Sequence, residues 1–113
     1  MNIFYLHEDP YQCANLHCDK HVVKMVLESA QMLSTAHRIL DGDEFADRNS
    51  LYKATHVKHP SSVWVRQSGQ NYRWLAHLWV GLGRQYSLRY AGKVHKSATL
   101  SGLEVLTVSI PQD

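Results

Sequence analysis

Four polar side chains that could take part in acid–base chemistry fall on one face of a single predicted helix. They are His17, His21, Lys24 and Glu28, and steps of four, three and four residues place them in one line along an α-helix. A carboxylate held beside a lysine and a histidine can serve in acid–base or electrostatic catalysis. An ordinary helical ion pair between Lys24 and Glu28, with a hydrogen-bonded His21, is the plainer interpretation, and both stay open.

The stretch that must position these side chains covers residues 15–40. Its polar stripe continues through Gln31, Thr35 and Arg38, whereas the rest of the circumference is almost wholly apolar. The apolar residues are Val22, Val23, Val26, Leu27, Ala30, Leu33, Ala36 and Leu40. Because a surface helix normally has a narrower apolar stripe, we expect this helix to lie in the core, with its polar stripe facing a cleft or a second layer. Burying a charged side chain costs free energy, so such residues are normally paired with an opposite charge or take part in function.

Helix-end signals lie on both sides of this stretch. Asp9 before Pro10, with Gln12 completing a capping-box pattern, predicts a helix start at Pro10. From there the chain either kinks near Asn15 or makes a short turn before the long helix. Asp41 and Gly42 are predicted to end the long helix with a glycine just past its last turn.

A second long helix is predicted over residues 63–90, after a start signal at Pro60, Ser61 and Ser62. Its core-facing residues are expected to be Leu75, Leu78, Leu82 and Tyr86. Gly81 and Gly83 are poor helix residues, so they either break this helix or allow close packing. Between the two long helices, residues 44–48 are predicted to form one helical turn.

Length and composition indicate one globular domain over residues 1–113. The helical patterns predict an all-α fold with two long antiparallel helices, one of them buried, and a functional connecting loop. The chain is 44% hydrophobic and 19% charged. No signal peptide or membrane-spanning stretch is visible, and Cys13 and Cys18 are expected to be reduced thiols, so we expect a cytoplasmic protein. Residues 105–110 alternate like a strand, and the abrupt end at Asp113 leads us to expect a truncated chain.

Basic and aromatic residues in three separate segments have the composition of a phosphate-binding surface. The net charge of +2 permits nucleic-acid binding without requiring it. The candidate nucleic-acid-binding residues are Arg66, Arg73, Arg84, Lys58, Lys96, Tyr52, His56 and His59. A solvated helix face with no binding role is about equally consistent with this pattern.

Two histidine pairs have spacing that metal ligands often use. His17 and His21 are four residues apart, and His56 and His59 are three apart. No pair of thiolates or acidic ligand completes a recognised pattern around them. We therefore predict that the protein holds no metal and no cofactor, and keep a histidine-based metal site as the third alternative.

Several short motifs resemble a family of small uncharacterised proteins from marine phages and bacteria. The motifs are MNIFYL at residues 1–6, CDKHVVKM at 18–25, the THxxHP turn at 55–60, NYxWL at 71–75 and HKS at 95–97. The resemblance covers nearly the whole chain as far as residue 97. Members of that family continue beyond the point where this chain stops, which agrees with the expected truncation.

The order of features is also remotely similar to the pyrimidine-dimer DNA glycosylases of endonuclease V type. Asp19, His21 and Glu28 reproduce their D-x-H motif and the catalytic Glu seven residues after its histidine. The similarity implies a compact all-α fold and attack of the N-terminal amine, here that of Met1, on deoxyribose C1′. Leu27 and Gln31 stand where that family has arginines.

These observations together predict a DNA-directed glycosylase or lyase acting on damaged or modified pyrimidine, as in DNA repair. Glu28 is the predicted catalytic carboxylate, and His21 and Lys24 are expected to tune it. The candidate nucleophiles are the α-amine of Met1 and the amine of Lys24, and the α-amine is preferred because its reference pKa is lower. Tyr52 or a tryptophan is expected to stack an extruded base. The alternative is a non-catalytic nucleic-acid-binding or protein-binding accessory module.

Overall fold

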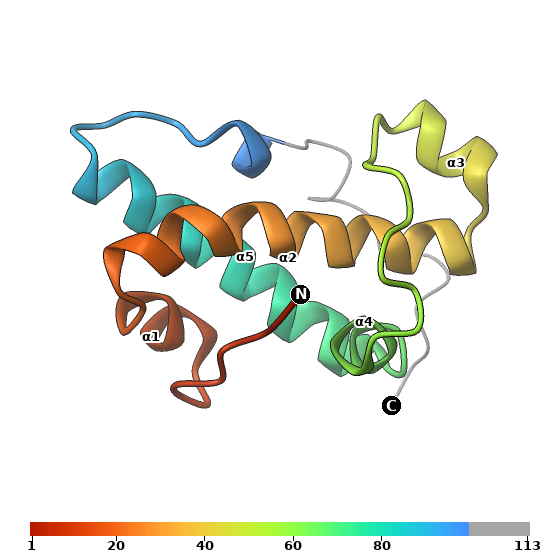
Figure 1. The fold of residues 1–113 in the computed structure, drawn as a ribbon, viewed down its shortest axis with the longest axis horizontal. Helices are drawn as coiled ribbons and strands as arrows, with labels where there is room; N and C mark the ends of the chain where they lie inside the picture. The colour runs from red at the N-terminus through yellow and green to blue at the C-terminus, as the bar shows by residue number, and fades with distance from the viewer. Residues whose placement is uncertain (100–113) are drawn as a thin grey trace.

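The helix α2, Asp19–Leu40, runs through the middle of the molecule, and most of the other helices pack against it (Figure 1). The structure is a computed structural model, and it describes residues 1–99. The order of elements is α1 (Pro10–Asn15), α2, α3 (Asp43–Arg48), α4 (Pro60–Val65), α5 (Gly69–Arg89) and the 3-10 helix η1 (Lys96–Thr99). No strand occurs among the described residues, so the predicted all-α fold is confirmed. The strand expected at residues 105–110 lies outside the described residues.

The central position of α2 agrees with its predicted burial, but the burial is incomplete. Val22, Val26 and Leu33 are fully buried in the core. Val23 and Leu27, which the apolar pattern assigned to the interior, are 38% and 39% exposed. Glu28 on the polar stripe is only 9% exposed, so this stripe does not simply face open solvent.

A turn separates α1 from α2, so of the two alternatives near Asn15 the structure shows the short turn, and the long helix begins at Asp19. Asp9 caps α1 as expected, because its carboxylate accepts a hydrogen bond of 2.8 Å from the Gln12 backbone N–H. Arg89 at the end of α5 stabilises the turn by donating to the carbonyl oxygens of Asn15 (3.0 Å) and His17 (2.7 Å). Since these acceptors come from residues distant in sequence from Arg89, the helix pattern alone could not choose between a kink and a turn.

The second predicted helix, over residues 63–90, is likewise two helices, α4 and α5. Ser68 caps the start of α5 by accepting from the Asn71 backbone N–H at 3.0 Å. The Asn71 side chain donates to the Trp64 carbonyl at 2.8 Å, which satisfies an acceptor at the end of α4. The start of α4 also differs from the prediction, because His59 is its capping residue and accepts from the Ser61 N–H at 3.1 Å.

Two glycines of α5 allow other segments to approach the helix closely. A Cβ at Gly81 would lie 3.0 Å from the Cβ of Ala14 on α1, and one at Gly83 would lie 3.0 Å from the Cβ of Ala98 on η1. The helix continues through both positions, so of the two alternatives the structure shows close packing. The predicted core stripe is confirmed at Leu75, Leu78 and Leu82, whereas Tyr86 is only partly buried.

Candidate active site

The N-terminal arm, residues 1–6, brings the α-amine of Met1 beside the middle of α2 (Figure 1). The amine nitrogen lies 3.8 Å from Oε1 of Glu28, and the Asn2 backbone N–H donates to the same oxygen at 3.1 Å. Lys24 Nζ lies 3.7 Å from the other carboxylate oxygen, Oε2. The largely buried carboxylate is therefore shared by two cationic groups, one of which is the chain terminus.

Contacts along the arm hold the terminus in this position. The thiol of Cys13 on α1 donates to the Phe4 carbonyl at 3.0 Å and accepts from the Leu6 N–H at 3.4 Å. The Met1 side chain is 2% exposed, and its sulfur accepts a weak contact of 3.6 Å from the Ser62 hydroxyl on α4. Cys13 is therefore a buried structural thiol, as expected, and Cys18 is free and exposed.

His21 and Lys24 differ in their relation to the carboxylate. Lys24 pairs with Glu28, although its side chain is 66% exposed. His21 stacks on the Phe4 ring, with ring centroids 4.5 Å apart. Among the described residues no hydrogen bond joins His21 to Glu28, and the contact of His21 with Phe4 supports the arm.

His17 is buried next to this site in a neutral arrangement. Its Nδ1 lies 2.7 Å from the Cys13 carbonyl and therefore carries the proton, while Nε2 is buried without a hydrogen-bond partner in the described structure. Burial lowers the pKa of His17, and the nearby charges of His21 and Arg89 lower it further, against the opposing effect of the carbonyl. Proton uptake by His17 is thus unfavourable in the folded protein.

We expect the protein to lose stability as the pH falls below about 6.5, the ordinary pKa of histidine. Between that value and the lowered pKa of His17, the unfolded chain binds more protons than the folded one, so the free energy of unfolding falls with pH. Urea unfolding at about pH 7.5 and about pH 5.5 measures the loss. His17→Asn should reduce it, whereas the exposed control His56→Asn should not, and equal losses in both variants would contradict this assignment.

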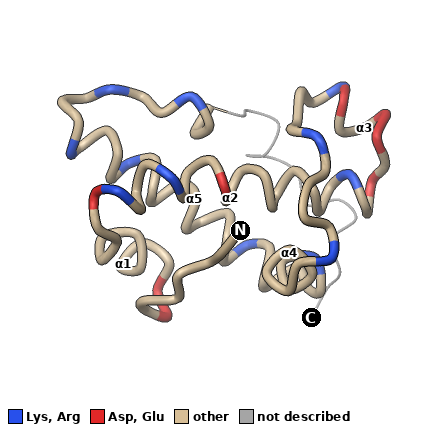
Figure 2. Tube along the Cα trace, viewed as in Figure 1, with Lys and Arg blue, Asp and Glu red and all other residues tan. Residues whose placement is uncertain are grey.

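The predicted nucleic-acid-binding residues do not form one stripe. Lysines and arginines are distributed over several elements (Figure 2). Arg73 and Arg84 are exposed on α5, and Lys58 and Lys96 are exposed on other segments. Arg66 lies outside α5, at the end of α4, and donates to the Val57 carbonyl at 2.7 Å, so the predicted Arg66/Arg73/Arg84 helix face is wrong for its first member.

Three other members of the predicted set stabilise the loop that contains them. The Tyr52 hydroxyl lies 2.9 Å from the Ser97 hydroxyl, which links the loop to η1. His59 caps α4. His56 has a left-handed backbone with φ of 50°, and its Nδ1 lies 2.8 Å from the Thr55 hydroxyl. These contacts give Tyr52 and His59 structural roles that their residue types did not reveal.

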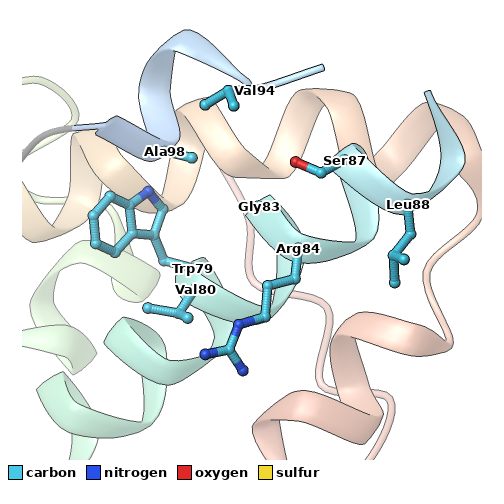
Figure 3. Close-up of a pocket in the computed structure, with 8 residues that line it drawn as sticks. All are labelled: Trp79, Val80, Gly83, Arg84, Ser87, Leu88, Val94 and Ala98. Carbon is cyan, nitrogen blue, oxygen red and sulfur yellow. The ribbon is translucent and has the colours of Figure 1, made fainter. Parts of the chain in front are cut away.

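Arg84 lines a pocket of about 530 Å³ between α5 and the segment that precedes and includes η1 (Figure 3). The lining residues are Trp79, Val80, Gly83, Arg84, Ser87, Leu88, Val94 and Ala98. Most of the lining is apolar, and the Arg84 guanidinium also lies 5.5 Å from the centroid of the Tyr11 ring. The surroundings of Arg84 therefore resemble an apolar groove more than a phosphate site.

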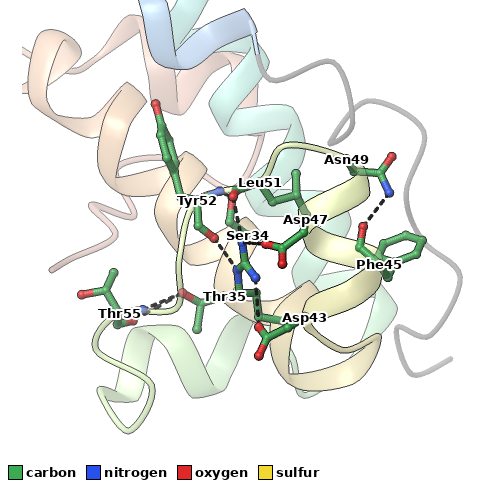
Figure 4. A network of polar contacts seen from close by, with 10 residues as sticks. Ser34, Thr35, Asp43, Phe45, Asp47, Asn49, Leu51, Tyr52 and Thr55 are labelled. Atoms are coloured by element: carbon green, nitrogen blue, oxygen red, sulfur yellow. Dashed lines mark hydrogen bonds and ion pairs between the residues drawn. The ribbon is translucent and has the colours of Figure 1, made fainter.

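Arg38 attaches the connecting loop to α2. The sequence pattern had placed Arg38 on the polar stripe and predicted no further role for it. It donates to the carbonyl oxygens of Tyr52 (2.8 Å) and Leu51 (3.0 Å), and pairs with Asp43 and Asp47 of α3, each at 2.9 Å (Figure 4). The hydrogen bond to Asp43 is the main cause that raises the pKa of Arg38. The loop that was predicted to be functional is thus firmly attached to the central helix.

The sequence patterns also did not predict a buried hydrogen-bonded network of three polar side chains, which we call the relay. His37 places Nδ1 2.7 Å from Asp41 Oδ2 and Nε2 2.6 Å from the Tyr72 hydroxyl. Burial raises the pKa of Tyr72, with a smaller contribution from the charge of Asp41. Since His37 is 0% and Tyr72 1% exposed, this relay joins α2 to α5 inside the core and does not meet a substrate.

The described residues contain no group of three or more His, Cys, Asp or Glu side chains that could hold a metal ion. The two predicted histidine pairs make the hydrogen bonds and ring contacts given above. Also within residues 1–99, no helix has the length and apolar character needed to cross a membrane. No family model, curated protein or solved structure matches this chain.

Proposed function

We propose that the protein is a DNA glycosylase or lyase that uses the α-amine of Met1 as nucleophile and Glu28 as catalytic carboxylate. The supporting observation is the 3.8 Å approach of the amine nitrogen to Glu28 Oε1, although Met1 and Glu28 are far apart in sequence. This is an ion-pair distance that exceeds hydrogen-bond reach, so the two groups must approach more closely, as catalytic groups often do when substrate binds. The carboxylate can then take a proton from the ammonium group and leave an amine with a free electron pair. The remote resemblance to pyrimidine-dimer glycosylases supplies the substrate class, damaged or modified pyrimidine in DNA.

The chemistry of the proposal balances without a metal or a redox partner. The amine electron pair forms a bond to deoxyribose C1′ while the glycosidic bond breaks. The base leaves with the electron pair of the broken glycosidic bond and takes up a proton. Opening of the sugar ring gives an imine between the amine and C1′. Removal of a C2′ proton then expels the 3′-phosphate and cleaves the strand, and hydrolysis of the imine regenerates the amine.

Borohydride trapping tests this proposal. Reduction in the presence of duplex DNA with an abasic site or a pyrimidine dimer should leave a covalent adduct on residue 1, located by peptide mass spectrometry. Lys24 is the second amine next to Glu28, and Lys24→Arg keeps its charge without a nucleophilic amine. This control variant should still be trapped. An adduct on Lys24, or none on either DNA, overturns the proposed nucleophile.

The second candidate is a non-catalytic nucleic-acid-binding module, favoured by the exposure of Arg73 and Arg84 on one helix. DNA binding without any trapped adduct would support it. Each phosphate contact should then contribute about 0.9 to the slope of log K against log salt on duplex DNA.

A further inference from the structure

A pocket separate from the N-terminal amine is walled by three aromatic side chains. It has a volume of about 450 Å³ and lies between the N-terminal arm, α4 and the first turns of α5. The lining residues are Tyr5, Glu8, Trp64, Gln70, Asn71 and Trp74. A hollow of about 260 Å³ adjoins it and shares the same three aromatic residues. The space is large enough for a small organic molecule, and the sequence patterns did not identify it.

The three rings meet at steep angles and not as parallel plates. The centroids of Tyr5 and Trp74 are 5.2 Å apart with an angle of 43° between the ring planes. Those of Trp64 and Trp74 are 6.2 Å apart at 85°. A flat heterocycle is held best between parallel rings, whereas a compact cation is favoured by several aromatic surfaces converging from different directions. This geometry therefore favours a rounded cation over a stacked base.

The charge of the lining points to the same class of ligand. Glu8 is the charged residue among the described lining residues, which include no lysine or arginine. The Trp74 indole N–H donates to the Glu8 backbone carbonyl at 2.8 Å, so the backbone of this exposed acidic residue is fixed beside the rings. Tyr5 is 66% exposed, so a ligand can reach this wall from solvent.

We propose that this pocket binds a methylated ammonium group of a small molecule, with the rings of Tyr5, Trp64 and Trp74 around the methyl groups and Glu8 as counter-charge. Methylated ammonium ions suit such a site because they are large, weakly hydrated cations, and aromatic cages are the usual means of recognising them. The inference does not depend on the proposed glycosylase activity, since it uses neither Met1 nor Glu28.

Titration with choline, followed by tryptophan fluorescence and calorimetry, tests the proposal. The matched ligand control is 3,3-dimethyl-1-butanol, which has the shape of choline without its charge. Choline should bind saturably and at least about tenfold more tightly than this alcohol, because the alcohol gains neither the cation–π attraction nor the pairing with Glu8. Equal responses to the two compounds, or no saturable binding of choline, would show that the aromatic cluster only packs.

Two variants locate the site. Glu8→Gln keeps the backbone carbonyl that holds Trp74, and Tyr5→Leu removes one exposed wall, so both should fold normally and each should weaken choline binding by about tenfold. Glu44→Gln, on an exposed position of α3, makes the same charge change away from the pocket and should leave binding unchanged. A peptide containing trimethyl-lysine provides a second source of the same group. Tighter binding of the peptide than of choline would mean that the ligand is a methylated protein and not a small molecule. An equal effect of Glu44→Gln and Glu8→Gln on choline binding would show that choline binds elsewhere.

Discussion

Replacing Glu28 with glutamine should lower the rate of strand cleavage by about 10²- to 10⁴-fold, the range that a positioned acid–base group contributes. Glutamine keeps an oxygen that can accept from the Asn2 N–H, now 3.1 Å from Glu28 Oε1, so the arm should remain in place. It cannot, however, take a proton from the Met1 ammonium group. Single-turnover rates on abasic duplex DNA measure the effect on chemistry without a contribution from product release.

Two comparisons separate lost chemistry from lost structure. Thermal unfolding of Glu28→Gln should show a folded protein, since the changed group loses charge but little volume. Glu44→Gln on the exposed surface of α3 should cleave as the wild type does. If Glu28→Gln cleaved as fast as the wild type, Glu28 would be only the ion-pair partner of Lys24, and the enzymatic proposal would fail.

Arg38→Met should lower the free energy of unfolding by about 3 kcal/mol. The methionine keeps most of the aliphatic packing but leaves the carbonyl oxygens of Leu51 and Tyr52 without their donors at 3.0 and 2.8 Å. The pairs with Asp43 and Asp47 contribute less, because these carboxylates are exposed. Urea denaturation at neutral pH gives the difference in stability.

Arg48→Met provides the matched control for this prediction. Arg48 is exposed on α3, and its replacement changes the charge of the same region by the same amount. Its effect should stay within about 0.5 kcal/mol. Equal losses from Arg38→Met and Arg48→Met would mean that net charge, and not attachment of the loop, determines stability there.

Local signals predicted the helical elements well because each depends on neighbours in sequence. The capping residue Asp9, the terminating Gly42 with its φ of 92°, and the core stripe of α5 all have such local causes. The turn after α1 was left as one of two alternatives because its stabilising donor is distant in sequence, whereas the break between α4 and α5 was missed although its signals are nearby in sequence. The turn between α1 and α2 is held by Arg89, and the break between α4 and α5 combines a local Ser68 cap with the Asn71 bond to Trp64.

For the candidate site, sequence identified the carboxylate and the two amines next to it. The spacing of Lys24 and Glu28 on one helix predicted their pairing, and the remote resemblance to the glycosylases gave Met1 as the candidate nucleophile. The stacking of His21 on Phe4 could not be predicted, because it depends on where the arm lies, which no helical period encodes. Arg38 and His37 were not recognised as network centres, since their partners come from separate segments.

The close contacts of Gly81 and Gly83 couple the evolution of positions that are far apart in sequence. With a Cβ at either glycine only 3.0 Å from the methyl group of Ala14 or Ala98, a larger residue on α5 requires backbone movement or loss of that methyl group. Residues 14 and 81, and likewise 83 and 98, should therefore covary as small–small pairs among natural variants of this fold. The same helix α1 carries Cys13, which holds the N-terminal arm. A larger residue at position 81 would displace α1 and with it the chain terminus, so substitutions at this position are constrained.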